Sequence, residues 1–356
     1  MSESNLFQPL KLRGVVLRNR VGVSPMCQYS SRDGYADEWH LVHLGGRAVG
    51  GAGLVFTEAT AVTAEGRISP EDLGLWKDEH VEFLGRITRF VIDHGAVPGI
   101  QLAHAGRKAS TAAPWLGGRP VPPDKGGWQP VAPSALPFEP HWPTPRMLDE
   151  EGIRSVVAAF RESAARAREA GFRVVEIHAA HGYLVHEFLS PLSNRRGDAY
   201  GGSFENRIRL AREITVAVRE VWPEEYPLFV RISATDWVEG GWDLEQSIEL
   251  ARVLGPLGVD AVDCSSGGLV PDARIPVGPA FQVPFARDIR RDARIATAAV
   301  GMITEPRQAE EILARGDADL VLLARQFLRE PYWPLRAARE LAAPAEWPPQ
   351  YRRAAD

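Results

Sequence analysis

Eight short runs of apolar residues constrain the fold of this chain more than any other feature. Each run is rich in Val, Ile, Leu and Ala, and most are followed by a loop and a segment with helical periodicity. Strands that alternate with helices form parallel sheets, and eight strands close a (β/α)8 barrel. We therefore predict an α/β fold, a single (β/α)8 TIM barrel. The predicted strands are Val21–Pro25, Leu54–Glu58, Val97–Leu102, Val174–His178, Leu228–Ile232, Ala261–Ser265, Ile295–Ala299 and Leu320–Ala324.

Helix boundaries can be read in the segments between several of these runs. The clearest helix is Asp149–Ala170, which begins at Asp149 as its N-cap and ends before Gly171. Two more are predicted at Leu244–Leu254, closed by Gly255, and Pro306–Ala314, closed by Gly316. A barrel explains this alternation better than a doubly wound sheet does. Because no repeat, linker or low-complexity tail divides the chain, we expect one domain over residues 1–356.

One stretch breaks the alternation, namely the long proline-rich excursion that follows the third predicted strand. Thr111–Pro145 contains ten prolines and Trp115, Trp128 and Trp142, so it is too long for an ordinary loop and unsuited to a helix. Loops at the carboxyl ends of barrel strands usually cover the active site. We expect this stretch to do so, and the alternative is a solvated insertion.

Composition narrows the classes of function. The formal net charge of -5 leaves no basic excess for nucleic acid, so small molecules are the expected partners. Two cysteines, Cys27 and Cys264, are too few for a disulfide framework or an iron–sulfur cluster. No apolar run approaches the roughly 18 residues of a membrane span, and the amino terminus does not resemble an export signal. We expect a cytoplasmic protein that binds neither nucleic acid nor membrane.

The segment from Glu176 to Tyr183 carries two histidines three residues apart. On an extended strand such positions point to opposite faces, so His178 and His181 converge only if the strand ends near His178 and the chain then turns. Two neutral imidazoles at the barrel mouth can stabilise negative charge on a substrate oxygen, and Tyr183 can supply a proton. Two alternatives stay open: a metal site that would need a third ligand, and histidines bonded only within a loop.

Other polar residues occupy the predicted strand ends. Arg231 would point into the barrel, where its charge requires an anion: a reduced flavin, or a neighbouring carboxylate. Gln101 can bond the edge of a uracil-like ring. Gly301 and Arg325 follow the last two strands, where barrels often bind phosphate. Cys27 has no adjacent base, so it is either a core thiol or a group beside a bound ring.

Taken together, these residues resemble the old yellow enzyme family, in its bacterial branch of xenobiotic reductases and NADPH dehydrogenases. The resemblance extends over most of the chain and depends on the order and spacing of several motifs. The motifs are Leu17–Val21, Ser24–Tyr29, Glu58–Ala61, Gly99–Lys108, His178–Tyr183 and Tyr200–Arg207. The last of these predicts a glycine turn into a helix capped by Ser203, which indicates kinship rather than catalysis.

The resemblance implies a bound FMN and a set of roles. The residues that would hold the FMN are Ser24, Pro25, Met26, Cys27, Ala61, Gln101 and Arg231, with Gly301, Ala324 and Arg325 at its phosphate. Many relatives have glycine where this chain has Ala324. The implied catalytic set is Tyr183, His178, His181 and Cys27, with Tyr29 also contacting substrate. Relatives form dimers or dimers of dimers, and Arg353 resembles the arginine that enters the neighbouring site.

The function that follows is an FMN-dependent ene-reductase. NADPH or NADH would reduce the FMN and leave, and an α,β-unsaturated carbonyl or nitro compound would then accept hydride in a ping-pong cycle. The alternatives are a metal-dependent barrel hydrolase that uses His178 and His181, and a flavin-binding barrel without turnover. Neither the physiological alkene nor the preferred nicotinamide can be derived from these residues.

Overall fold

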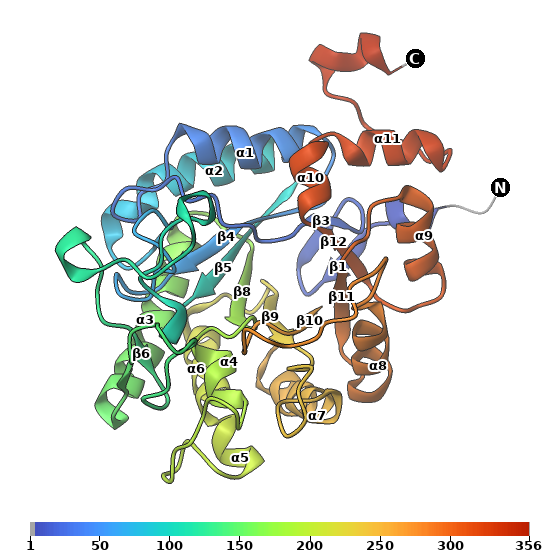
Figure 1. Ribbon diagram of the computed structural model, residues 1–356. Coiled ribbons are helices and arrows are strands. Elements are labelled where there is room, and N and C mark those ends of the chain that lie inside the picture. Colours follow the sequence, from blue (N-terminus) through green and yellow to red (C-terminus); the bar gives the residue numbers. More distant parts are fainter. Residues whose placement is uncertain (1–3, 356) are drawn as a thin grey trace.

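The computed structural model describes residues 4–355 and contains the predicted closed barrel of eight parallel strands (Figure 1). The strands follow one another around the barrel in chain order, and each predicted run agrees with its strand to within three residues at either end. The barrel strands are β3 (Val21–Val23), β4 (Leu54–Ala61), β5 (Val97–Ala103), β8 (Val174–Ala179), β9 (Leu228–Ser233), β10 (Ala261–Ser265), β11 (Ala296–Val300) and β12 (Leu320–Leu323).

Helices surround the barrel, as the alternation predicts. The helices are α1 (Glu38–Val49), α2 (Val81–Asp93), α3 (Glu150–Glu169), α4 (Leu184–Leu189), α5 (Phe204–Arg207), α6 (Arg209–Val221), α7 (Leu244–Leu254), α8 (Val283–Ala293), α9 (Pro306–Ala314), α10 (Arg325–Arg329) and α11 (Trp333–Glu340). Within residues 4–355, no helix is both long enough and apolar enough to cross a membrane.

The predicted helix boundaries are correct. The side chain of Asp149 accepts a hydrogen bond from Gly152 N, and Gly171 has the left-handed conformation that ends α3. Gly255 is the C-cap of α7, as predicted, but it does not adopt the left-handed conformation. Gly255 keeps helical angles, the chain adds a 3-10 turn at Gly255–Leu257, and Gly258, with a φ of 102°, is the residue that reverses the chain.

A short hairpin covers the amino-terminal end of the barrel. Its strands are β1 (Leu10–Leu12) and β2 (Val15–Leu17), which pair in antiparallel register. Val15 and Leu17 pack against the side chains that fill the barrel's lower interior, among them Phe56 and Phe229. The centroids of these two rings lie 6.0 Å apart. The interior is therefore apolar at this end, and polar side chains are confined to the upper part of the barrel.

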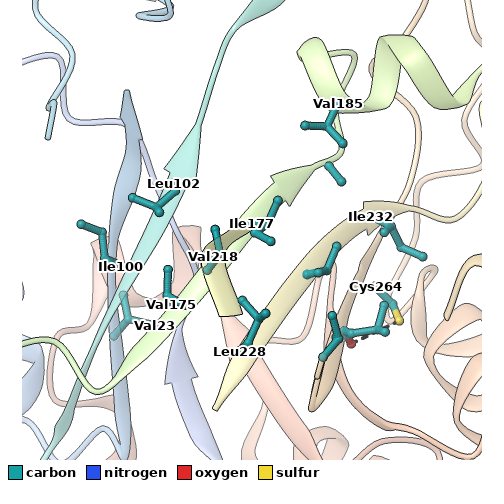
Figure 2. Packing of buried hydrophobic residues seen from close by; sticks show 14 of the residues in the cluster. Val23, Ile100, Leu102, Val175, Ile177, Val185, Val218, Leu228, Ile232 and Cys264 are labelled. Carbon is teal, nitrogen blue, oxygen red and sulfur yellow. Dashed lines mark hydrogen bonds between the residues drawn. The ribbon is translucent and has the colours of Figure 1, made fainter. Parts of the chain in front are cut away.

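A second apolar layer lies between the barrel and its helices. Ile100 and Leu102 of β5, Val175 and Ile177 of β8, and Ile232 of β9 project outward into it (Figure 2). Because neighbours along a strand point to opposite faces, the residues between them point into the barrel. This alternation places Gln101, Glu176 and Arg231 inside.

The excursion after β5 contains no α-helix over residues 104–149. It has 3-10 turns at Pro114–Leu116 and Pro123–Lys125, and β6 (Val131–Ala132) pairs with β7 (Arg146–Met147). Trp115 packs edge-on against Tyr29 with ring centroids 5.4 Å apart. That the stretch covers a bound substrate stays a prediction.

Candidate active site

The two histidines converge through the turn that the sequence required. Strand β8 ends at Ala179, and His181 adopts a left-handed conformation with a φ of 58°. The rings of His178 and His181 stand perpendicular with centroids 5.1 Å apart, and His178 Nε2 lies 3.4 Å from His181 Nδ1. Both histidines therefore present a ring nitrogen to one place at the carboxyl end of the barrel.

A backbone hydrogen bond identifies the protonated ring nitrogen of His178. Ala180 N donates to His178 Nδ1 at 3.2 Å, so the proton of neutral His178 is on Nε2. His181 Nε2 lies 2.6 Å from the hydroxyl of Ser265. Burial lowers the pKa of both imidazoles well below the ordinary value, and the charge of Arg231 lowers it further. The pair is neutral and can donate to a substrate oxygen.

Two residues that the sequence analysis did not single out hold this turn in place. Lys108 Nζ donates to His181 O and to Gly268 O, both at 2.9 Å. On the other side, Ser233 Oγ accepts from His181 N at 2.9 Å and donates to Gly267 O at 2.8 Å. The loop after β8 is thereby tied to the loop after β10 from two directions, which fixes His181.

Tyr183 stands beside the histidine pair. Its ring is perpendicular to that of His178 with centroids 5.0 Å apart, and Lys108 Nζ lies 5.3 Å from its centre. Burial raises the pKa of the phenol well above its ordinary value. Tyr183 therefore keeps its proton at neutral pH, as a proton donor must.

Cys27 and Tyr29 lie on the loop that follows β3. Glu58, fully enclosed beneath this loop, accepts from Gln28 N at 3.0 Å, and Tyr29 has a φ of 50°. Burial raises the pKa of the Cys27 thiol well above its ordinary value, and the carboxylates of Asp72 and Glu58 raise it further. Cys27 is a protonated thiol, which is unsuited to nucleophilic attack.

A layer of four polar side chains lies in the barrel directly above its apolar interior: Gln101, Glu176, Arg231 and Asp263, hereafter the polar layer. Gln101 Nε2 donates to Glu176 Oε1 at 2.7 Å. Arg231 Nε lies 3.2 Å from Asp263 Oδ2, and its Nη1 donates to Ser24 Oγ at 3.1 Å. Arg231 thus has the carboxylate partner that the sequence left open, and its outer edge reaches the loop after β3.

The predicted phosphate end lies where β11 and β12 finish. Gly301 has a φ of 116°, and a side chain there would meet Gln282 Nε2 at 2.7 Å. Ala324 precedes α10, and the exposed Arg325 at its start makes no hydrogen bond or ion pair with any residue between 4 and 355. An unpaired guanidinium beside a glycine that admits close backbone approach suits a phosphate.

The other residues predicted to contact the FMN lie on the loop after β3 and at the end of β4. Ser24 is buried, Pro25 and Met26 are partly exposed at the barrel mouth, and Ala61 ends β4. Arg353 is apart from them. It lies on the exposed 3-10 segment Pro349–Ala354, beyond α11 and away from the barrel (Figure 1). The structure therefore gathers the predicted cofactor and substrate residues at one end of the barrel, except for Arg353.

Among residues 4–355, no three His, Cys, Asp or Glu side chains are grouped so that they could hold a metal ion. Glu176, the nearest acidic residue in sequence, receives the Gln101 amide instead of facing the histidines. The residues fit a ring system with a phosphate. The buried Arg231 and the partly exposed loop after β3 lie where the ring would be, and Arg325, unpaired within residues 4–355, lies where the phosphate would be.

Comparison with known proteins agrees with this geometry. The model of a family described as the NADH:flavin oxidoreductase / NADH oxidase family matches residues 5–343. An NADPH dehydrogenase of Geobacillus sp. (strain WCH70) is 51% identical over 353 residues, 99% of this chain and 98% of that protein. Morphinone reductase superposes with a TM-score of 0.80 at 30% identity, over 98% of this chain and 93% of its own. An old yellow enzyme homologue from Zymomonas mobilis gives 0.77 at 28%, over 96% and 94%.

The match at about half identity covers nearly the whole of both chains, and the structural likeness includes the entire barrel. The chain therefore belongs to the NADH:flavin oxidoreductase / NADH oxidase family, and its predicted kinship with the old yellow enzymes is confirmed.

Proposed function

We propose that this protein is an FMN-dependent ene-reductase that takes hydride from NAD(P)H and reduces activated alkenes. The observation that carries the proposal is the neutral His178–His181 pair, which faces the same barrel mouth as Arg231, Cys27 and Tyr183. Family membership supports the flavin, and the name NADPH dehydrogenase that its relatives carry supports NADPH as the donor.

The histidine pair would bind the carbonyl or nitro oxygen of the substrate. His178 Nε2 carries a proton, and the Ser265 hydroxyl can donate to His181 Nε2, which places the second proton on His181 Nδ1. Two N–H groups then point at one acceptor and stabilise the charge that develops on it. Tyr183 would protonate the α-carbon, since burial keeps its phenol protonated.

The cofactor would lie across the carboxyl ends of the strands. Ser24–Cys27, Ala61, Gln101 and Arg231 would hold its ring, and Gly301, Ala324 and Arg325 its phosphate. FMN supplies the two-electron chemistry when bound, since it accepts hydride from NAD(P)H and returns it to the β-carbon. The chain's own contribution is to orient both partners and to keep water from the site.

The test combines colour with a double variant. The purified protein should be yellow, bleach with NADPH and recover its colour with cyclohexenone. H178A/H181A should retain FMN but lose at least tenfold in cyclohexenone affinity, because both hydrogen-bond donors to the substrate oxygen are gone. A colourless, chelator-sensitive protein would refute the proposal. Loss of FMN from a folded double variant would refute the assigned roles.

We also propose that the active unit is a homodimer or a dimer of dimers in which Arg353 enters the neighbouring site. Beside Cys27 there is a hollow of about 550 Å³ with exposed apolar walls, formed in part by Trp39, Val42, Trp115 and Leu328. The segment bearing Arg353 extends away from its own barrel. Sedimentation should give a dimer or larger, and R353A should raise KM without changing FMN content. A monomer with full activity would refute this.

A further inference from the structure

Two carboxyl groups of the polar layer have no role in the function proposed above. Glu176 and Asp263 are both fully enclosed inside the barrel. Glu176 Oε2 and both oxygens of Asp263 make no hydrogen bond to any residue in the described range 4–355, nor does Arg231 Nε. Buried carboxylates without such partners are unfavourable unless they bind protons or pair with a cation.

The charges around these carboxyls do not balance if both are ionised. Arg231 from β9 is the cation in contact, 3.2 Å from Asp263. Gln101 from β5, which donates to Glu176, is neutral. His178, the neighbour of Arg231 on β8, is also neutral. One guanidinium can neutralise one carboxylate, so a second negative charge would be left over inside the barrel.

Burial raises the pKa of both carboxyl groups. Burial and the neighbouring Asp263 raise the pKa of Glu176 well above its ordinary value, although Arg231 and the Gln101 hydrogen bond lower it. Burial raises the pKa of Asp263 to about 6, against the opposing charge of Arg231. Because Arg231 contacts Asp263 while Glu176 contacts only the neutral amide of Gln101, we infer that the resting layer holds one proton on Glu176 and that Asp263 is ionised.

We propose that Glu176 and Asp263 form a buried proton-binding site that takes up one further proton when the cofactor above them is reduced. This inference rests on the proposed function, since it requires FMN near Arg231. Reduction places a negative charge near the guanidinium that Asp263 now holds. The two anions then compete for one cation, and protonation of Asp263 removes the competition.

The proton balance of this step is explicit. NAD(P)H gives up a hydride, two electrons with one proton, and becomes NAD(P)⁺, while the reduced ring carries one negative charge. No solvent proton is consumed in that transfer. Asp263 then binds one proton from solvent, and it releases the proton when hydride passes to the alkene and the ring becomes neutral again.

The first experiment counts protons in the unaltered holoenzyme. The FMN-loaded protein is reduced anaerobically with one equivalent of NADPH in weakly buffered solution at pH 7, and a pH indicator reports proton uptake. We expect close to one proton consumed per FMN reduced. No uptake, in a protein whose FMN is reduced and then reoxidised by cyclohexenone, refutes this inference and leaves the proposed function intact. Protein that binds no FMN refutes both.

The second experiment measures the midpoint potential of bound FMN between pH 7 and 8, where Asp263, with its pKa raised to about 6, is ionised before reduction. Each proton bound per two electrons adds about 30 mV per pH unit, so the slope should be about 59 mV instead of 30. E176Q/D263N should return it to about 30 mV. E176Q, which imitates the protonated acid, should keep the steep slope, as should the control E187Q at another buried carboxyl outside the barrel. A steep slope in the double variant overturns the assignment.

Discussion

Gly182 offers a stringent test of how the histidine turn is held. Its φ is 75°, and an added Cβ would lie 2.2 Å from Gly268 O, a backbone atom that cannot turn aside. G182A therefore meets two penalties. A left-handed alanine costs about 1–2 kcal/mol. Overpacking against the neighbouring loop costs about 1–3 kcal/mol more.

The chain contains a matched control. Gly202 has a φ of 80°, yet an added Cβ there meets nothing within 4 Å. G202A should therefore reduce the free energy of unfolding only by the cost of a left-handed alanine, about 1–2 kcal/mol. The difference between the two variants isolates the contact between the loops after β8 and β10.

The functional effect should separate the variants further. Parting the two loops stretches the Lys108 bridge between His181 O and Gly268 O, which moves His181. A displacement of about 1 Å can reduce turnover about 100-fold. We expect that loss in cyclohexenone reduction by G182A, with FMN content unchanged, and near-normal turnover by G202A. Urea denaturation gives the stabilities. Equal stability and equal turnover in the two variants would refute the argument.

Three further predictions concern single side chains. Burial lowers the pKa of Lys108 from 10.5 to about 8. Between pH 8 and 10.5, the Lys108 amine is therefore protonated in the unfolded chain and mostly neutral in the folded one. The free energy of unfolding should rise between pH 8 and 10.5 by up to about 3 kcal/mol, and K108M should lose this rise in urea denaturation. F229A should reduce the free energy of unfolding by about 3–5 kcal/mol, because Phe229 fills the barrel interior. R325A should lower FMN affinity at least tenfold in fluorescence titrations and leave the apoprotein's unfolding unchanged, since Arg325 has no partner within residues 4–355.

The barrel was predictable because its signal is local and repeated. Apolar runs specify strands, and a boundary such as Asp149 or Gly171 specifies a helix end through a single hydrogen bond or dihedral angle. The convergence of His178 and His181 was predictable for the same reason, since it needs only a turn after β8. What Arg231 contacts was not predictable, because a guanidinium accepts either a carboxylate or a cofactor.

The residues that support the site were missed for a physical reason. Lys108 acts through bonds to carbonyls 73 and 160 residues away, and these are set by barrel closure. Asp263 could be noticed in the sequence, because it is an acid between Val262 and Cys264 in the predicted strand Ala261–Ser265. Alternate residues of a strand point to the same face, so the position of Asp263 in its strand predicts that it points into the barrel. A charged residue at such an inward position indicates a polar layer.

The hairpin at the base of the barrel gives the polar layer a kinetic property. Val15 and Leu17 seal the lower end with apolar side chains, and Phe56 and Phe229 fill the interior above them. Solvent can then reach Glu176 and Asp263 only from the open end, where the cofactor would lie. Proton exchange with bulk water would have to wait for that end to clear, so the layer would hold its charge state between ligand exchanges. Because the base of the barrel is closed by apolar side chains, the rate of proton exchange in the polar layer would be set by how often the cofactor end opens.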